Sequence, residues 1–400
     1  MQRSILFLGL LAFIAASIGA NPILAQEPTV ITSLTGDSYK GTITEITADG
    51  KVKGDGFDEL GLAGLLTINR SIKPNQPTVK FIIRLAGGGQ IYVNEALIEE
   101  GIVKAKSNFG DLDISVGTVR AIVYKPFGLP GAANDAIQNP SKNNDQVVVE
   151  TSNRVQTVSG LVEEINNEKV RFNFNEKSRT IDRTKVIAAV MADLQEKQSA
   201  GVLATVKMKD TSTIVGSIQS LAEGKLTVGL LGDSKLVVPF GDVVSINIRS
   251  DRLVFLSDLE PKDVEYQSVV TPKKEISKDQ NLAGNPISLV WNSTKKTQTY
   301  ARGISAHSYT RMVFENDGFH RLASVCGIDS ETGGNGDCRV IVKGDGIELW
   351  SEQISASNDP KKIDIEIDGY KEIEITVDYG KHLDMADHVS FANIRFLKTK

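Results

Sequence analysis

The sequence's densest run of acids and glycines is GIDSETGGNGDC, residues 327–338. Its three acids, Asp329, Glu331 and Asp337, carry the carboxylate oxygens that calcium prefers as ligands. Two oxygen ligands of the twelve-residue calcium-binding loop are missing, and no Lys-Ser or Lys-Thr pair follows the glycines as in a phosphate-binding loop. We therefore expect a hairpin loop whose glycines supply positive φ angles, with a looser cation site on the three acids as the alternative.

Aromatic and polar residues nearby have the chemistry that sugar recognition uses. Trp291 offers a flat ring, and the apolar C–H faces of pyranose rings stack on aromatic rings. Asp387 and His388 can accept and donate hydrogen bonds to sugar hydroxyls. Core packing is nevertheless the leading interpretation of Trp291, with sugar stacking as the alternative. The segment 382–388 is interpreted as an exposed polar loop, with a zinc site on its two histidines and an acid as the alternative.

The sequence lacks the motifs of common hydrolases. It contains no Gly-x-Ser-x-Gly and no His-Glu-x-x-His. A glycosidase needs two carboxylates that flank the scissile bond, but acids such as those of KIDIEID, residues 362–368, alternate with apolar residues as on a solvated strand face. We expect a protein that is not an enzyme, and an unrecognised hydrolase is the remaining alternative.

The composition of the chain indicates what kind of fold positions these residues. The chain has 400 residues, of which 40% are hydrophobic and 24% charged, and this is typical of a folded protein with several domains. Its net charge of -5 argues against a nucleic-acid partner, because nucleic-acid binding needs a basic surface.

Residues 1–25 have the pattern of a secretory signal peptide. Arg3 gives a positive start, an apolar run follows from Ile5 to Ala20, and small residues precede a preferred cleavage after Ala25. A membrane anchor is the alternative, but the run is shorter than the roughly 20 residues that span a bilayer. No later segment is apolar enough to span one. We expect an exported protein that is secreted, periplasmic or attached to the cell envelope.

The two cysteines, Cys326 and Cys338, flank the glycine-rich run. Disulfides persist in exported proteins, and a hairpin would bring the two sulfurs together across its strands. We expect a disulfide between them, with a pair of buried free thiols as the alternative.

Short runs rich in Val, Ile and Thr dominate from Val30 onward, and their period-two alternation predicts an all-β protein. A degenerate repeat runs through residues 30–250. Each copy has a strand, a turn, a second strand, a second turn and a last strand with an apolar ending. The copies span Tyr39–Arg70, Ile91–Ile122, Val158–Val190 and Ile214–Ile246.

One small antiparallel meander cannot bury its apolar face alone, so we expect the copies to pair into barrels or sandwiches. The first pair spans residues 27–125 and the second spans residues 147–250. Between them lies a predicted linker, residues 126–146, which is rich in Pro, Gly and Asn. The repeats show no catalytic constellation and suit a scaffold or contacts with other envelope proteins.

From Leu253 the composition changes, because both tryptophans, all four histidines and both cysteines follow it. Four runs occur here in order: FLSDLEPKDVEYQ, NPISLVWN, YARGISAHSYTRMVFEND and FHRLASVCGIDSETGGNGDCRVIVKGDGIELWSE. They resemble the NPCBM family of carbohydrate-binding modules over residues 253–398. The resemblance implies a jelly-roll β-sandwich of the galactose-binding-like type, with sugar binding at one end and often a structural calcium ion.

The resemblance also singles out individual residues. The family's Gly-x-x-x-His motif falls on His307, for which it implies a role in facing or organising the ligand. Members of the family typically end in Asp-His-Ala-Asp-Trp-Ala-Asn-Ala, where this chain has DHVSFANI. Asp387, His388 and Asn393 keep that pattern, and the resemblance implies sugar contacts for them.

Two positions depart from the family's ending. Ser390 stands in place of the second acid and Phe391 in place of the tryptophan. We expect a secreted, non-catalytic protein that binds a glycan or an envelope polysaccharide through its C-terminal domain. The alternative is a structural or envelope-assembly protein whose β-sandwich contacts proteins, and the two departures favour it.

Overall fold

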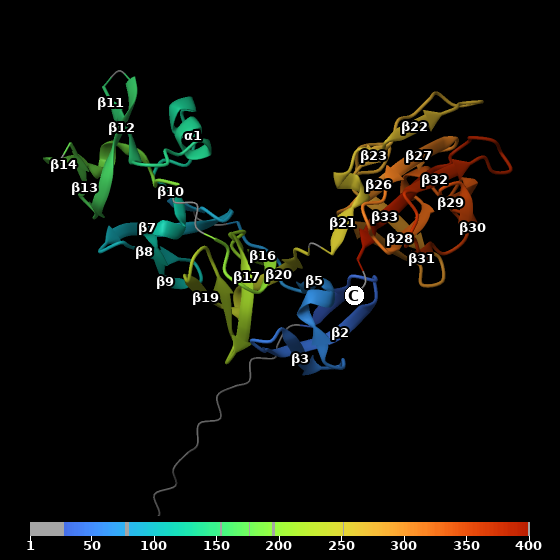
Figure 1. The fold of residues 1–400 in the computed structure, drawn as a ribbon, viewed down its shortest axis with the longest axis horizontal. Helices are drawn as coiled ribbons and strands as arrows, with labels where there is room; N and C mark the ends of the chain where they lie inside the picture. Colours follow the sequence, from blue (N-terminus) through green and yellow to red (C-terminus); the bar gives the residue numbers. More distant parts are fainter. Residues whose placement is uncertain are drawn as a thin grey trace, which may run out of the picture.

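The structure is a computed structural model that describes residues 28–76, 80–152, 154–175, 177–193, 197–250 and 252–398. The predicted signal peptide, residues 1–25, lies outside the described residues. Strands β1 to β33 make up most of the described chain, together with short 3-10 turns and one α-helix, so the all-β prediction is confirmed. Figure 1 shows the repeats at the left and centre and the C-terminal sandwich at the right.

Each repeat is a five-stranded antiparallel sheet. The strands of the first two repeats are β1 (Thr29–Ser33), β2 (Ser38–Ile46), β3 (Lys51–Asp55), β4 (Leu60–Gly61), β5 (Leu65–Arg70), β6 (Phe81–Leu85), β7 (Gly89–Glu99), β8 (Ile102–Ser107), β9 (Gly110–Ser115) and β10 (Val119–Val123). Those of the last two are β11 (Asp145–Thr151), β12 (Arg154–Ile165), β13 (Lys169–Phe174), β14 (Lys177–Asp182), β15 (Val186–Val190), β16 (Val202–Met208), β17 (Thr213–Ala222), β18 (Lys225–Gly229), β19 (Lys235–Pro239) and β20 (Val243–Ile248).

All four repeats have the same strand order. The first repeat runs β4-β3-β2-β1-β5, and the others follow the same pattern. A 3-10 turn precedes each fifth strand, and the second strand of each repeat carries a β-bulge against the third. A bulge bends the strand, so one long strand can close a small curved sheet over its apolar side chains.

The repeats do not pair in the predicted way. Strand β5 pairs with β20 and β10 pairs with β15, so the first repeat joins the fourth and the second joins the third. The prediction of pairs at 27–125 and 147–250 is therefore wrong. The fifth strand is an edge of its own sheet, and an edge strand is stabilised by pairing with another edge rather than by closeness in sequence. Together the four repeats form one continuous sheet of twenty strands.

The predicted linker, residues 126–146, contains a packed helix, α1 (Gly131–Gln138). Ala133, Ala136 and Ile137 are buried in an apolar cluster with residues of β10, β11 and β15. These three side chains lie on one face because residues three and four apart are neighbours on a helix. The segment is thus part of the third repeat's packing, and the linker prediction is corrected.

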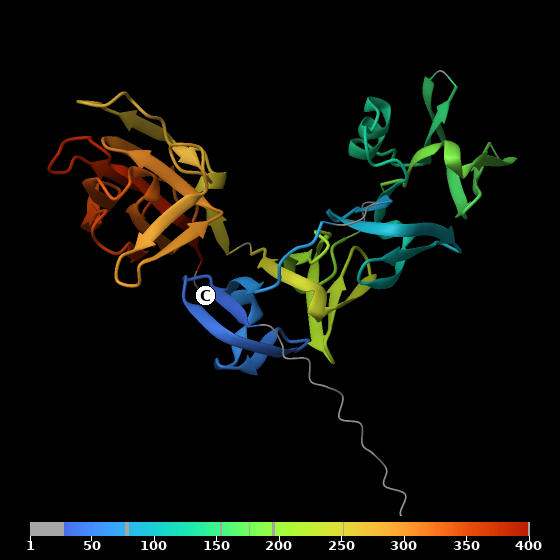
Figure 2. The same ribbon diagram turned by 180° about the vertical axis from the view of Figure 1, so that it is seen from behind.

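The C-terminal unit is a sandwich of two antiparallel sheets, as predicted (Figures 1 and 2). One sheet contains β21 (Leu253–Phe255), β23 (Ser277–Lys278), β26 (Gly303–His307), β28 (Arg321–Ile328), β31 (Lys361–Glu366) and β33 (His388–Leu397). The other contains β22 (Asp263–Tyr266), β27 (Thr310–Glu315), β29 (Asp337–Gly344), β30 (Ile347–Ser355) and β32 (Glu372–Asp378). A separate hairpin is formed by β24 (Ile287–Trp291) and β25 (Lys296–Tyr300).

The glycine-rich run is not a hairpin tip. It leaves β28 in one sheet and enters β29 in the other, so it crosses between the two layers of the sandwich. Cys326 and Cys338 are both fully buried free thiols in the core between the sheets. The predicted disulfide is not formed in the structure, and the hairpin that was expected to bring the two sulfurs together is absent. The thiols instead pack as small apolar groups.

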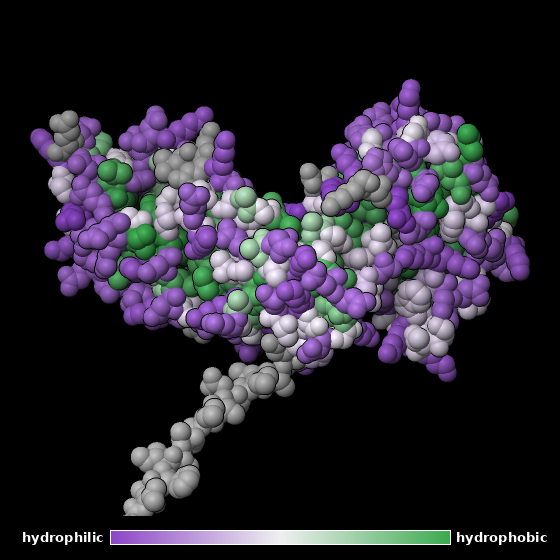
Figure 3. Space-filling view, turned by 60° about the horizontal axis from the view of Figure 1, so that its bottom comes forward, coloured by the Kyte–Doolittle hydropathy of each residue, from purple (hydrophilic) through white to green (hydrophobic). Residues whose placement is uncertain are grey.

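Polar side chains cover most of the face that Figure 3 shows, with small apolar groups between them. No helix within the described ranges is long and apolar enough to cross a membrane.

Candidate functional site

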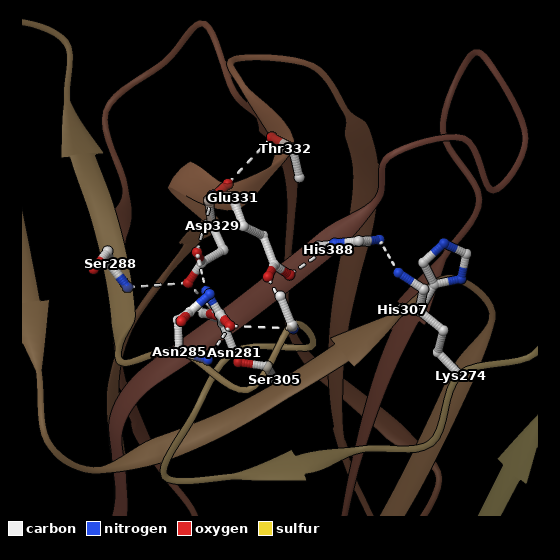
Figure 4. Close-up of polar contacts among 12 residues, drawn as sticks. Lys274, Asn281, Asn285, Ser288, Ser305, His307, Asp329, Glu331, Thr332 and His388 are labelled. Carbon is white, nitrogen blue, oxygen red and sulfur yellow. Dashed lines mark hydrogen bonds and ion pairs between the residues drawn. The ribbon is translucent and has the colours of Figure 1, made fainter.

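Four polar side chains gather at one end of the sandwich, and we call them the end cluster: Lys274, His307, Glu331 and His388 (Figure 4). His307 ends β26 and His388 begins β33, and the two residues are opposite each other in the strand register. Glu331 lies in the 3-10 turn Ser330–Thr332, just after β28. The cluster thus sits where strand ends and loops meet.

A chain of hydrogen bonds runs through His388. The Lys274 Nζ lies 2.8 Å from Nε2 of His388, and Nδ1 of His388 lies 2.7 Å from Oε1 of Glu331. An ammonium has only donors, so Nε2 accepts, and the proton on Nδ1 is donated to the Glu331 carboxylate. Burial and the Lys274 charge lower the pKa of His388, although Glu331 opposes this shift. His388 is therefore a neutral link between an ammonium and a carboxylate.

His307 forms the buried back of the cluster. Its side chain is almost inaccessible, its Nε2 lies 3.3 Å from the Thr271 hydroxyl, and its ring meets the His388 ring edge-on with centroids 5.3 Å apart. Burial, followed by the neighbouring His388, lowers the pKa of His307. His307 thus packs against His388 and is itself almost inaccessible to solvent.

Asp329 is fully occupied by hydrogen-bond donors. Its Oδ1 accepts from the Asn281 amide at 3.1 Å and from the Glu331 backbone N–H at 3.1 Å. Its Oδ2 accepts from the Ser288 backbone N–H at 3.0 Å and from the Ser390 hydroxyl at 2.9 Å. A cation needs free lone pairs, and donors already point at both oxygens (Figure 4).

The other two predicted cation ligands do not complete a metal site. Glu331 accepts from His388 and from the Ala283 backbone N–H at 2.9 Å, and Asp337 accepts from the Lys381 backbone N–H at 3.1 Å. Among the residues that the structure describes, no group of three or more His, Cys, Asp or Glu side chains could hold a metal ion. The three acids predicted as ligands therefore do not form a site for the implied calcium ion.

Asp387 lies in the interior. Its side chain is 0% exposed, and it accepts from the Ser308 hydroxyl at 2.7 Å and from the Asp337 backbone N–H at 3.0 Å. Burial raises the pKa of Asp387 to about 6, although the bond from Ser308 opposes this shift. The carboxylate ties β29 and the loop after β26 to the start of β33.

Trp291 and Asn393 lie elsewhere. Trp291 ends β24, and Asn393 is five residues beyond His388 on β33, which is about 16 Å along a strand. Both line a cavity that faces the first repeat. The structure thus places the five predicted sugar-binding residues at two separate locations.

Sequence reasoning missed Lys274 and the loop that carries it. Asp384 is buried and accepts from the backbone N–H groups of Val269, Val270 and Thr271, which lie 2.8 to 3.3 Å from its oxygens. These bonds fasten the loop before Lys274. The sequence here reads TPKKE, a pattern typical of a solvated loop, and contains no signal that would have marked Lys274.

Comparison with known proteins identifies the domain family of the C-terminal unit. Residues 252–397 match the NPCBM/NEW2 domain family, which confirms the resemblance of this third of the chain. The described residues of this third therefore form an NPCBM domain with a β-sandwich fold. No curated protein matches the chain.

Several solved structures are similar to parts of the chain. The CBM51 module from Clostridium perfringens GH95, in complex with methyl-galactose, is 23% identical over 36% of this chain and 99% of that chain, with a TM-score of 0.33. The CBM51-2 and INT domains of Clostridium perfringens ZmpB, in complex with GlcNAc, are 25% identical over 44% of this chain and 37% of that chain, with a TM-score of 0.35. The tandem CBM51 modules of Sp3GH98 from Streptococcus pneumoniae SP3-BS71 are 15% identical, with a TM-score of 0.33, over 77% of this chain and 88% of that chain.

Proposed function

We propose that this protein binds carbohydrate through its NPCBM domain, at the end cluster. The observation that carries the proposal is the family match over residues 252–397, because NPCBM domains are carbohydrate-binding modules. The end cluster supplies suitable chemistry. A sugar hydroxyl both donates and accepts, and the cluster offers an ammonium beside a carboxylate, joined by an imidazole.

The end cluster is partly open to a ligand. The side chains of His388 and Glu331 are 18% and 10% exposed. Lys274 has three N–H donors and directs one of them to His388, so two remain for a ligand. Each Glu331 oxygen also has a second lone pair beyond the bond that it already accepts.

The departures at Ser390 and Phe391 do not remove ligand-facing groups. Both side chains are 0% exposed. Phe391 belongs to the core between the sheets, and Ser390 bonds to Asp329. Both replacements therefore lie in the interior of the domain and not among the side chains of the end cluster.

The proposed binding is non-catalytic. The end cluster contains one carboxylate, Glu331. The neighbouring Asp329, Asp384 and Asp387 are buried, and their oxygens are committed to backbone and side-chain donors. Glycoside hydrolysis needs two carboxyl groups that can exchange protons with the substrate. The proposal also includes export by the N-terminal 25 residues and a scaffold role for the repeats, supported by the composition of the sequence.

A glycan array probed with the full protein tests the proposal, followed by titration calorimetry with the sugars that bind. We expect Glu331→Gln and His388→Ala to weaken binding at least tenfold, because each breaks the hydrogen-bonded chain. The control is Lys225→Ala, which removes an exposed lysine of the fourth repeat. Binding that survives both substitutions unchanged would move the sugar away from the end cluster, and an empty array would remove carbohydrate binding altogether.

A further inference from the structure

The sandwich is fixed against the first repeat. The buried Arg395 donates through Nε to the Leu34 carbonyl at 2.7 Å, and Lys362 forms an ion pair with Asp37 at 3.2 Å. Leu34 and Leu66 of the first repeat pack with side chains of the sandwich in one apolar cluster. The surfaces of the sandwich and of the first repeat beside this contact are therefore held in fixed positions relative to each other.

A cleft lies beside this contact, between the sandwich and the first and fourth repeats. It has two lobes with volumes of about 570 Å³ and about 270 Å³. The lobes adjoin, because they share the lining residues Thr32, Leu66, Gln298, Tyr300 and Asn393. We call them together the junction cleft. Pockets for small ligands have volumes of about 300 to 1,000 Å³, so its size is in the usual range.

The walls of the junction cleft carry hydroxyl and amide groups on both sides. On the repeat side, Asn69 of β5 and Asn247 of β20 line the larger lobe. On the sandwich side, Gln298 and Asn393 line both lobes. An amide offers two donors and a carbonyl acceptor, so this lining can match groups that both donate and accept.

The charges around the junction cleft are mostly paired within the protein. Arg302 forms ion pairs with Asp258 and with Asp279, the latter at 2.9 Å. Arg395 is committed to two backbone carbonyls, and Lys362 to Asp37. Lys207 lines the larger lobe and is exposed. Because most of these charges are already paired, the lining does not require a charged ligand.

Three aromatic side chains complete the lining: Phe255 in the larger lobe, Trp291 in the smaller lobe and Tyr300 in both. Burial raises the pKa of Tyr300, and the neighbouring Trp291 indole opposes this shift. Among the described residues, however, the buried Trp291 Nε1 finds no hydrogen-bond acceptor of normal geometry.

We propose that the junction cleft is a second binding site, which takes an uncharged oligosaccharide. Amides and hydroxyls meet the sugar hydroxyls, an aromatic face meets a pyranose ring, and the paired charges leave no strong preference for an anion. The site goes beyond the proposed function, because half of its wall belongs to repeats outside the NPCBM domain. Sugar bound there contacts the sandwich and the repeats at once.

Hydrogen–deuterium exchange of the full protein locates such a site without knowledge of the exact ligand. The probes are uncharged hexasaccharides of glucose, mannose and galactose, each at millimolar concentration. We expect slower exchange in residues 243–248 and 298–302 with at least one probe. Slower exchange confined to the loops of the end cluster would overturn the junction site and leave the proposed function intact. No change with any probe would overturn the junction site, and the glycan array would then decide the proposed function separately.

Substitutions on both walls give an independent measurement. We expect Gln298→Ala to weaken binding of the active hexasaccharide several-fold and Asn69→Trp, which fills the cleft, to abolish protection of residues 243–248. Both positions are exposed, so neither change is expected to disturb folding. His388→Ala is the matched control and leaves this protection unchanged. Unaltered protection in Asn69→Trp, with unaltered unfolding temperature, would overturn the proposal.

Discussion

Protonation of His388 makes the stability of the end cluster depend on pH. Because burial and then Lys274 lower its pKa, the folded protein resists the proton that the unfolded chain takes up below about pH 6.5. The unfolded state then binds more protons, and stability falls as the pH falls. Protonation also removes the acceptor for Lys274 and breaks the hydrogen-bonded chain.

We predict that His388→Gln flattens the loss of stability below pH 6.5, since an amide can accept from Lys274 and donate to Glu331 without titrating. Urea unfolding between pH 5 and 8 measures this. Part of the slope remains, because burial lowers the pKa of His307 in the same direction. Identical slopes for the variant and the wild type would contradict the assignment of a neutral His388.

Ser390 provides one of the hydrogen bonds that the buried Asp329 carboxylate accepts. Its hydroxyl satisfies one oxygen of Asp329 and also meets the Ser305 hydroxyl at 2.7 Å. We predict that Ser390→Asp destabilises the domain by about 3 kcal/mol or more, because it buries a second carboxylate beside the first. Calcium is expected to restore part of that stability in the variant. EDTA is expected to leave the wild-type unfolding temperature unchanged, and a drop would contradict the saturated Asp329.

Sequence patterns identified individual residues better than their roles. His307 and His388 were found from the family's motifs, and the strand register places them together. Asp387 was found in the same way but faces the interior. Lys274 could not be predicted, because the loop that carries it is held by hydrogen bonds to Asp384, which lies more than a hundred residues later in the chain. Long-range loop contacts of this kind leave no local pattern.

At the scale of elements, period-two alternation was enough to predict strands, but it does not state which strands pair. The hairpin prediction for the glycine-rich run failed for that reason: β28 and β29 belong to different sheets. The helix α1 was missed because Pro and Gly around it dominate the composition, although Ala133, Ala136 and Ile137 have helical spacing.

The crossing between sheets leads to a prediction about Cys326 and Cys338. Burial raises the pKa of both thiols, so neither forms a reactive thiolate in the folded protein. We expect a thiol reagent at pH 8 to label no cysteine of the native protein and both cysteines in 6 M guanidinium chloride. Unfolded, unreduced protein that yields no thiols would show that a disulfide exists after all.

At the scale of the whole molecule, Arg395 holds the sandwich to the first repeat. It is almost fully buried and donates to the carbonyls of Leu34 and Asn393. We predict that Arg395→Ala loosens this junction and increases the radius of gyration measured by small-angle X-ray scattering. Hydrogen bonds from charged groups contribute about 1.5 to 3 kcal/mol, so the loss is substantial.

Lys362→Ala is the matched control at the same junction. It removes an ion pair whose two side chains are about half exposed, and such pairs contribute about 0 to 1 kcal/mol. Its scattering profile is therefore expected to match the wild type. An unchanged profile for Arg395→Ala would show that the apolar cluster alone holds the junction.

The nested pairing of the repeats makes the N-terminal region a hairpin on a larger scale, with whole repeats in place of strands. The first and fourth repeats form its base beside the sandwich, and the second and third form its far end (Figure 1). The second and third repeats therefore form a side branch. The chain enters this branch from the first repeat and returns from it to the fourth repeat, and the points of entry and return lie close together. A change in the length of this branch is therefore expected to leave the junction cleft in place.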